Sequence, residues 1–387
     1  MRSGWPHTED GQGKRPADQR QVPFGPEVSW PTGYSDLEYR DGDYRYAAPR
    51  AAALSAAAPG EHPYAAFTAA GYGDDGGQSM FASYVKKYPS NKPQFTYMTN
   101  EADALAKFHA GLRPDLFRPY VGWTKYFATS GFVQPWDPKL ISNFKHLNPF
   151  MVKAGQVNGK QYGIPDDWGI DAVLYRSDKV TPKSKSYGLL FDERYKGKIA
   201  WFDDIEMIEI AGLYLGFKNT WNQTDAQLKQ SQNFLISKKH LVRTIWSSET
   251  DLDQQFASGD VWIALAWPAD WVQMRAKKLP VVYMHPSVGK QKPIAWVGMF
   301  MLLQGTPRPD LAHAYVDAWS SAASGKWLED NYGYGHANVL ARPSSSDLLK
   351  ALQLTNPRAV TLPYAYFDRN VPRRAVYAKA WDEVKAA

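Results

Sequence analysis

The chain has 387 residues, a formal net charge of +6 and no cysteine. This length suits one large domain or two of moderate size, and the missing cysteines exclude disulfides, thiol nucleophiles and cysteine-ligated metal centres. The positive charge is typical of some nucleic-acid-binding proteins, but no dense Lys/Arg run and no RRM, zinc-finger or helix-turn-helix signature accompanies it. We therefore expect no nucleic-acid partner.

The amino-terminal part of the chain differs in composition from the rest. Residues 1–60 contain seven Pro and seven Gly but no Ile and only four Val or Leu, too little apolar surface to offset the entropy lost on ordering. We predict a disordered or irregular segment over 1–63. It shows no charged n-region followed by an apolar h-region, so no convincing secretory signal is recognised, and no run of 18 apolar residues predicts a spanning helix.

Strand and helix signals alternate from residue 64 onward. We predict strands at 64–68, at 94–98 and from 115, with helices at 81–87 and from Asn100. Such a strand–helix rhythm is typical of a parallel sheet covered by helices.

A second set of α/β signals follows the segment Pro165–Gly169, whose Pro, Asp and Gly favour a hinge turn. Strands are predicted at 172–175, 198–202 and 261–266, and helices at 206–215 and 251–258. The short apolar strands fit a helix-covered α/β sheet.

The last part of the chain begins with a buried strand at 293–303. An amphipathic helix from Asp310 places Leu311, Tyr315 and Trp319 on one face, and an aromatic-Gly loop follows at 331–338. A final amphipathic helix is predicted at 377–385.

Enzyme and metal motifs are missing from the sequence. There is no G-x-S-x-G elbow, P-loop or Rossmann glycine motif, and the eight His residues show no H-x-x-x-H or H-E-x-x-H spacing. We therefore expect no catalytic residues, no metal site and no cofactor. An enzyme that uses Asp204 and Glu206 as an acid/base pair is the less favoured alternative.

Several short motifs occur in an order that resembles the extracellular solute-binding proteins of ABC importers, nearest to the spermidine/putrescine-binding type. The resemblance covers about residues 64–385. It rests on FTAAGY from Phe67 to Tyr72, GFVQPWD from Gly131 to Asp137, Tyr162–Pro165, Asp203–Glu206, Ser258–Asp260, Trp267, Trp296, and Gly333 with Tyr334.

This resemblance implies an α/β, periplasmic-binding-protein-like (type II) fold with two α/β lobes and a ligand cleft between them. We predict one lobe from 64–167 plus 297–340 and the other from 168–296 plus 341–387. The resemblance further implies a non-enzymatic, monomeric binding component that delivers its ligand to an ABC permease from a periplasmic or extracellular location.

A polyamine needs aromatic faces for its methylenes and carboxylates for its ammonium groups, and the 14% aromatic content suits such a ligand. By the resemblance, Glu206 holds an amine and either Asp203 or Asp204 is a second acid; helix capping is an equally good role for this turn. The predicted ligand-binding residues are Tyr72, Trp123, Asp167, Asp204, Glu206, Trp267, Trp296 and Tyr334.

The chain also departs from the family pattern. Ala69 stands where the family has a Trp, and Gly298 stands where it has an acid two residues after the cleft Trp. Losing that carboxylate weakens the case for one particular ammonium contact, for which Asp166, Asp167 or Trp168 are candidate substitutes. Another solute, such as an amino-acid-derived cation, an opine or ferric ion, therefore remains an alternative.

Overall fold

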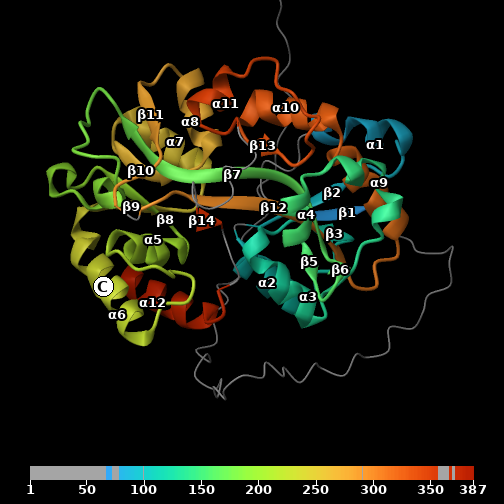
Figure 1. The fold of residues 1–387 in the computed structure, drawn as a ribbon, viewed down its shortest axis with the longest axis horizontal. Helices are drawn as coiled ribbons and strands as arrows, with labels where there is room; N and C mark the ends of the chain where they lie inside the picture. The colour runs from blue at the N-terminus through green and yellow to red at the C-terminus, as the bar shows by residue number, and fades with distance from the viewer. Residues whose placement is uncertain (1–66, 72–77, 99, 290, 356–365, 368–370) are drawn as a thin grey trace, which may run out of the picture. The chain divides into compact units, whose positions relative to one another are not determined.

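The computed structural model describes residues 67–71, 78–98, 100–289, 291–355, 366–367 and 371–387. The segment 1–63 and the predicted ligand contact Tyr72 lie outside these ranges. Within them strands and helices alternate along the chain (Figure 1). The predicted α/β class is confirmed.

One mixed sheet contains most of the strands, in the hydrogen-bonded order β2-β1-β3-β12-β7-β10-β8-β9. In addition, β11 and β13 pair with β7, whereas β4 and β14 pair with β12. A separate hairpin joins β5 (Gln156–Val157) to β6 (Lys160–Gln161). The strands of the sheet are β1 (Thr68–Gly71), β2 (Gln94–Tyr97), β3 (Leu116–Phe117), β4 (Val133–Gln134), β7 (Gly163–Arg176), β8 (Ile199–Phe202), β9 (Val242–Trp246), β10 (Ile263–Ala266), β11 (Val281–Met284), β12 (Ile294–Leu303), β13 (Gly335–His336) and β14 (Tyr366–Phe367).

The two longest described strands, β7 and β12, run antiparallel side by side through the middle of the sheet (Figure 1). Ile294 lies opposite Asp171, and Met301 lies opposite Gly163. All ten residues of β12 are buried. A strand covered on both faces is expected to be a continuous apolar run, and the sequence of β12 is one.

Pro165–Gly169 forms no hinge turn, contrary to our expectation, but continues β7. Pro165 pairs with Met299, directly beyond a register shift between Val297 and Met299. Because a proline cannot donate to the ladder, such an irregularity is where a strand tolerates it. The two acidic side chains of the segment are held by Arg118, as described below.

Parallel strands β1, β2 and β3 lie on the β12 side of the sheet. β1 begins at Thr68, and all four of its residues pair with β2. Residues 64–66 of the strand predicted at 64–68 lie outside the described ranges. The amphipathic helix from 309 is confirmed, with its predicted apolar face buried. The helices of this part are α1 (Ala82–Lys87), α2 (Glu101–His109), α3 (Thr124–Ser130), α4 (Pro149–Ala154), α9 (Pro309–Trp319) and α10 (Ala322–Tyr332).

On the β7 side, β8, β9 and β10 form a second group, with β8 parallel to both of its neighbours. The carboxyl-terminal helix α12 packs against α5 and α6 of this group. Its helices are α5 (Glu206–Tyr214), α6 (Asp225–Lys238), α7 (Glu249–Ser258), α8 (Pro268–Ala276) and α12 (Arg374–Ala386), and a short helix α11 (Asp347–Ala351) precedes α12 in the chain.

Two groups of strands therefore flank the β7–β12 pair, while the hydrogen-bonded path runs without a break from β2 to β9. Residues of both long strands occur in the two largest buried apolar clusters, and the first cluster joins Ala69 of β1 to Ala200 of β8 and Ala264 of β10. The division into lobes at 64–167 plus 297–340 and 168–296 plus 341–387 stays a prediction.

Candidate functional site

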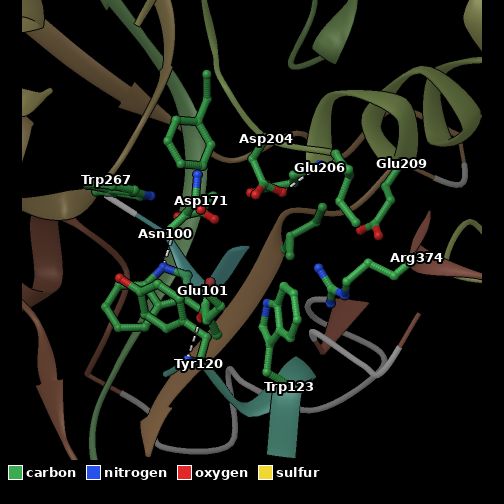
Figure 2. A pocket seen from close by; sticks show the side chains of 14 residues that line it. Asn100, Glu101, Tyr120, Trp123, Asp171, Asp204, Glu206, Glu209, Trp267 and Arg374 are labelled. Carbon is green, nitrogen blue, oxygen red and sulfur yellow. Dashed lines mark hydrogen bonds between the residues drawn. The ribbon is translucent and has the colours of Figure 1, made fainter. Parts of the chain in front are cut away.

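A cavity of about 670 Å³, including the part open to solvent, lies beside the β7–β12 pair and beyond the carboxyl ends of β8 and β10. Ligands of open α/β sheets bind at such strand ends. Figure 2 shows the side chains that surround it. The lining residues are Asn100, Glu101, Tyr120, Trp123, Asp171, Phe202, Asp204, Ile205, Glu206, Glu209, Trp267, Ile294, Trp296 and Arg374.

Three of the acids come from the turn between β8 and α5 and from the first turn of α5. Asp204 Oδ1 accepts a hydrogen bond from the backbone N–H of Glu206 at 2.9 Å, and Glu209 follows one turn later. The first turn of a helix favours negative charge, so the expected capping role and a cavity-facing role coincide. Asp203 instead accepts a hydrogen bond from Trp381 Nε1 at 2.8 Å, which leaves Asp204 as the acid that lines the cavity.

Two further acids reach the cavity from other elements. Asp171 lies within β7, and its Oδ1 accepts a hydrogen bond from Trp296 Nε1 at 2.8 Å. Glu101 begins α2, and its Oε1 accepts the backbone N–H of Tyr120 at 2.8 Å. These bonds fix both carboxyl groups and the aromatic residues beside them.

Aromatic side chains form the remaining walls. Trp267 packs edge-on against Phe202 and Trp246 at centroid distances of 5.1 and 5.2 Å. Trp296 meets Tyr120 at 5.1 Å. The indole of Trp296 crosses Gly169 of the paired strand, where a Cβ would lie 2.4 Å from Cζ2, so only glycine leaves this indole its place.

Arg374, the first residue of α12, supplies the basic side chain among the described lining residues. Its guanidinium carbon lies 4.0 Å from the ring centroid of Trp123. Both side chains are half-buried. This distance is within the range of a cation–π contact.

The crowding of carboxyl groups changes their acidity. Burial raises the pKa of Glu101 to about 7, against an opposing hydrogen bond from Tyr120 and the charge of Arg374. Burial also raises the pKa of Asp204. The pKa of Glu206 is raised well above its ordinary value, first by burial and then by the negative charges of Asp171, Asp204 and Glu209. The cavity thus holds more carboxyl groups than its surroundings stabilise in the charged form.

The structure brings five of the eight predicted ligand residues to this cavity: Trp123, Asp204, Glu206, Trp267 and Trp296. Tyr334 is buried behind the lining, with its ring 5.1 Å from that of Trp296 and nearly perpendicular to it. Asp167 is also outside the lining. Ligand contact by these residues stays a prediction.

Asp167 belongs to a buried ion cluster with Asp166 and Arg118. Arg118 Nε lies 2.5 Å from Asp166 Oδ2, and its Nη2 lies 2.5 Å from Asp167 Oδ2. A Cβ on Gly298 would lie 2.3 Å from Asp167 Oδ1. The acid that the resemblance expects at 298 therefore has no room here, and neither Asp166 nor Asp167 lines the cavity in its place.

Sequence reasoning did not predict nine of the fourteen lining residues as ligand contacts. The polar or aromatic ones that matter most for a cation are Glu101, Tyr120, Asp171, Glu209 and Arg374. Asp171 carries the clearest signal, because a charged residue inside a buried apolar strand needs a special environment. Glu101 was assigned only as a helix start. Arg374 precedes the predicted helix at 377–385 and could be placed only by the tertiary fold.

None of the helices in the described ranges combines the length and apolar character needed to span a bilayer. Within the same ranges, no group of three His, Asp or Glu side chains is arranged to hold a metal ion.

Comparison with known proteins places the fold and the family. The sequence model described as bacterial extracellular solute-binding protein matches residues 80–346, more than half of the chain. The spermidine/putrescine-binding periplasmic protein of Escherichia coli (strain K12) is 24% identical over 296 residues, which cover 75% of this chain and 83% of that protein. The putrescine/cadaverine-binding protein of Pseudomonas aeruginosa is 25% identical over 307 residues, with coverages of 75% and 85%.

Among solved structures, the TpPotD lipoprotein of Treponema pallidum matches with a TM-score of 0.70 at 16% identity, covering 82% of this chain and 99% of that one. The match confirms the predicted periplasmic-binding-protein-like fold. With the family model matching most of the same chain, we conclude that this protein belongs to the bacterial extracellular solute-binding proteins.

Proposed function

We propose that this protein is the non-enzymatic binding component of an ABC importer and that its ligand is a small organic cation of the spermidine or putrescine type. One observation carries the proposal: among the described residues, five carboxyl groups and five aromatic side chains line one cavity together with one guanidinium group. The names of the Escherichia coli and Pseudomonas aeruginosa relatives support the ligand class. A periplasmic or extracellular location and delivery to a membrane permease follow from the same family.

The cavity matches the chemistry of such a ligand. Ammonium groups pair with carboxylates through charge-assisted hydrogen bonds, and the methylenes between them pack on aromatic faces. A ligand with two positive charges would also offset the repulsion among Asp171, Asp204 and Glu206. A neutral ligand would leave that repulsion in place.

Calorimetric titration of the protein with putrescine, spermidine and 1,4-butanediol tests the proposal. The diol has the four-carbon chain of putrescine without its charges. We expect saturable binding of the amines and none of the diol, with the bound amine recovered chemically unchanged. Equal binding of putrescine and the diol would contradict a cation site, and conversion of the amine would contradict the non-enzymatic role.

Replacing Trp267 by Ala is expected to weaken putrescine binding by about 2 kcal/mol, because it removes an aromatic wall at the centre of the site. Trp267 is only half-buried, so the unfolding free energy should change less. Titration calorimetry and urea unfolding of the same sample measure the two effects. Trp262→Ala is the matched control, because Trp262 is also half-buried but lies outside the lining; equal binding losses in the two variants would refute the assignment.

Affinity for the cation should fall as the pH is lowered from about 8 to about 5.5. Protons compete with the ligand for the carboxyl groups, and the pKa of Glu101 is about 7 while that of Glu206 is also raised. The affinity for the cation therefore begins to fall at a pH nearer neutrality than it would for an ordinary Glu, whose pKa is about 4.3. Titrations in buffers of different ionisation enthalpy should show proton release on binding. The prediction would be refuted if the affinity did not change over this pH range and no proton were released on binding.

A further inference from the structure

Arg374 brings a positive charge into a cavity that is otherwise acidic. Figure 2 shows its side chain pointing toward the cavity beside Trp123. The guanidinium carbon stands 4.0 Å from the ring centroid of Trp123, and both residues belong to the lining.

The surroundings of Arg374 are those that a cationic ligand group requires. The aromatic face of Trp123 lies on one side of the guanidinium group. The positive charge of Arg374 also lowers the pKa values of Glu101 and Asp204, against the rise that burial causes. An aromatic face with nearby carboxyl groups stabilises an ammonium ion as well as a guanidinium ion.

Contacts outside the cavity hold Arg374 in place. In the same helix, Tyr377 Oη donates to Thr220 O at 2.7 Å and accepts from Gln223 N at 2.7 Å. One turn further, Trp381 Nε1 donates to Asp203 Oδ1 at 2.8 Å. These bonds anchor α12 by contacts outside the cavity, and the helix begins with Arg374 at the cavity.

We propose that Arg374 permanently fills one cation subsite of the cavity and so makes the protein selective for diamines over triamines. This inference rests on the proposed function, since it assumes that amines bind. The carboxyl groups that remain to bind the ligand's ammonium groups include Asp171 and Glu206. The indoles of Trp267 and Trp296 line the same cavity. A short diamine places both of its charges there, whereas a third ammonium would meet the guanidinium group.

The experiment compares dissociation constants for putrescine and spermidine in the parent and in Arg374→Met, which keeps an unbranched side chain but removes the charge. We expect the parent to bind putrescine at least about tenfold more tightly than spermidine, because like charges a few ångströms apart in a partly desolvated site repel strongly. In Arg374→Met the ratio should shift toward spermidine by about tenfold or more. Arg374→Lys, which keeps the charge, should retain the preference for putrescine.

Lys379→Met is the matched control, since Lys379 is an exposed cation on the same helix and outside the cavity; it should leave the ratio unchanged. If the parent binds putrescine but Arg374→Met shows the parent's ratio, the subsite assignment is wrong and the proposed function stands. If neither amine binds the parent or Arg374→Met, the proposed function itself is wrong, and this inference with it.

Discussion

Replacing Glu206 by Gln is expected to weaken putrescine binding by about 1.5–3 kcal/mol, the usual range for a hydrogen bond to a charged group. The change keeps the shape of the side chain and removes its charge. Glu206 stands at the start of α5 with its Oε1 buried and without a hydrogen-bond partner among the described residues. An ammonium group bound beside Glu206 would give this buried oxygen the partner it lacks.

The same substitution should stabilise the ligand-free protein. The pKa of Glu206 is raised in the folded state by burial and by neighbouring acids, so the folded protein binds more protons than the unfolded chain above the ordinary pKa of Glu. Stability then falls as the pH rises through the interval between the two pKa values. Gln removes this loss, so the variant should unfold at a higher urea concentration at neutral pH and lose that advantage near pH 4.

Calorimetry and urea unfolding at two pH values measure both effects. Glu193→Gln is the control, because Glu193 is an exposed acid that pairs with Lys238 outside the cavity; it should leave putrescine affinity unchanged. An affinity for Glu206→Gln equal to that of the parent would refute the cation-binding assignment.

Local sequence patterns predicted those elements whose residue pattern does not depend on partners far away in the chain. The strand at 293–303 is an apolar run buried on both faces, and the helix from Asp310 repeats apolar residues at helical spacing; both are confirmed. Helix α6 was missed because its residues are mostly polar, although Thr224 and Gln227 form a capping box at its start. The strand predicted at 172–175 is the end of the longer β7, because Pro165, Asp166 and Asp167 are turn signals in the sequence. Tertiary partners such as Arg118 accommodate these acids within the strand.

The candidate site shows the same limit. Glu206, Asp204 and Trp267 follow strand ends, where the alternation of strands and helices already directs attention. Asp171 is placed by its register opposite Ile294, and Arg374 by the docking of α12 on α5 and α6. Neither the strand register of Asp171 nor the packing of α12 can be read from a short stretch of sequence. The resemblance likewise suggested a missing acid at Gly298 without showing that Asp171, on the neighbouring strand, carries a carboxyl group into the cavity.

Arg118 is a buried cation that pairs with two adjacent acids of β7. It is 3% exposed, and its partners Asp166 and Asp167 are 0% and 1% exposed. Its guanidinium carbon also lies 5.6 Å from the ring centroid of Trp319. One guanidinium group therefore pairs with both adjacent carboxylates of β7, and we expect these two buried charges to depend on it.

Replacing Arg118 by Met should therefore lower the free energy of unfolding by about 3–5 kcal/mol, the cost of leaving buried charges without their partner. Burial raises the pKa of Asp166 and Arg118 opposes that rise, so the variant's deficit should shrink as the pH falls and the carboxyl groups take up protons. Urea unfolding at pH 7 and pH 5 measures both quantities.

Arg113→Met is the control, because Arg113 is exposed and bonds only to nearby backbone carbonyls in the described structure. The double variant Arg118→Met with Asp167→Asn should recover part of the lost stability, since it removes one of the two buried charges that Arg118 neutralises in the parent. If Arg118→Met unfolds at the parent's urea concentration, or if its deficit is the same at both pH values, the two buried charges do not depend on Arg118 as argued. Folded Arg118→Met should still bind putrescine, because neither Arg118 nor its two acids line the cavity.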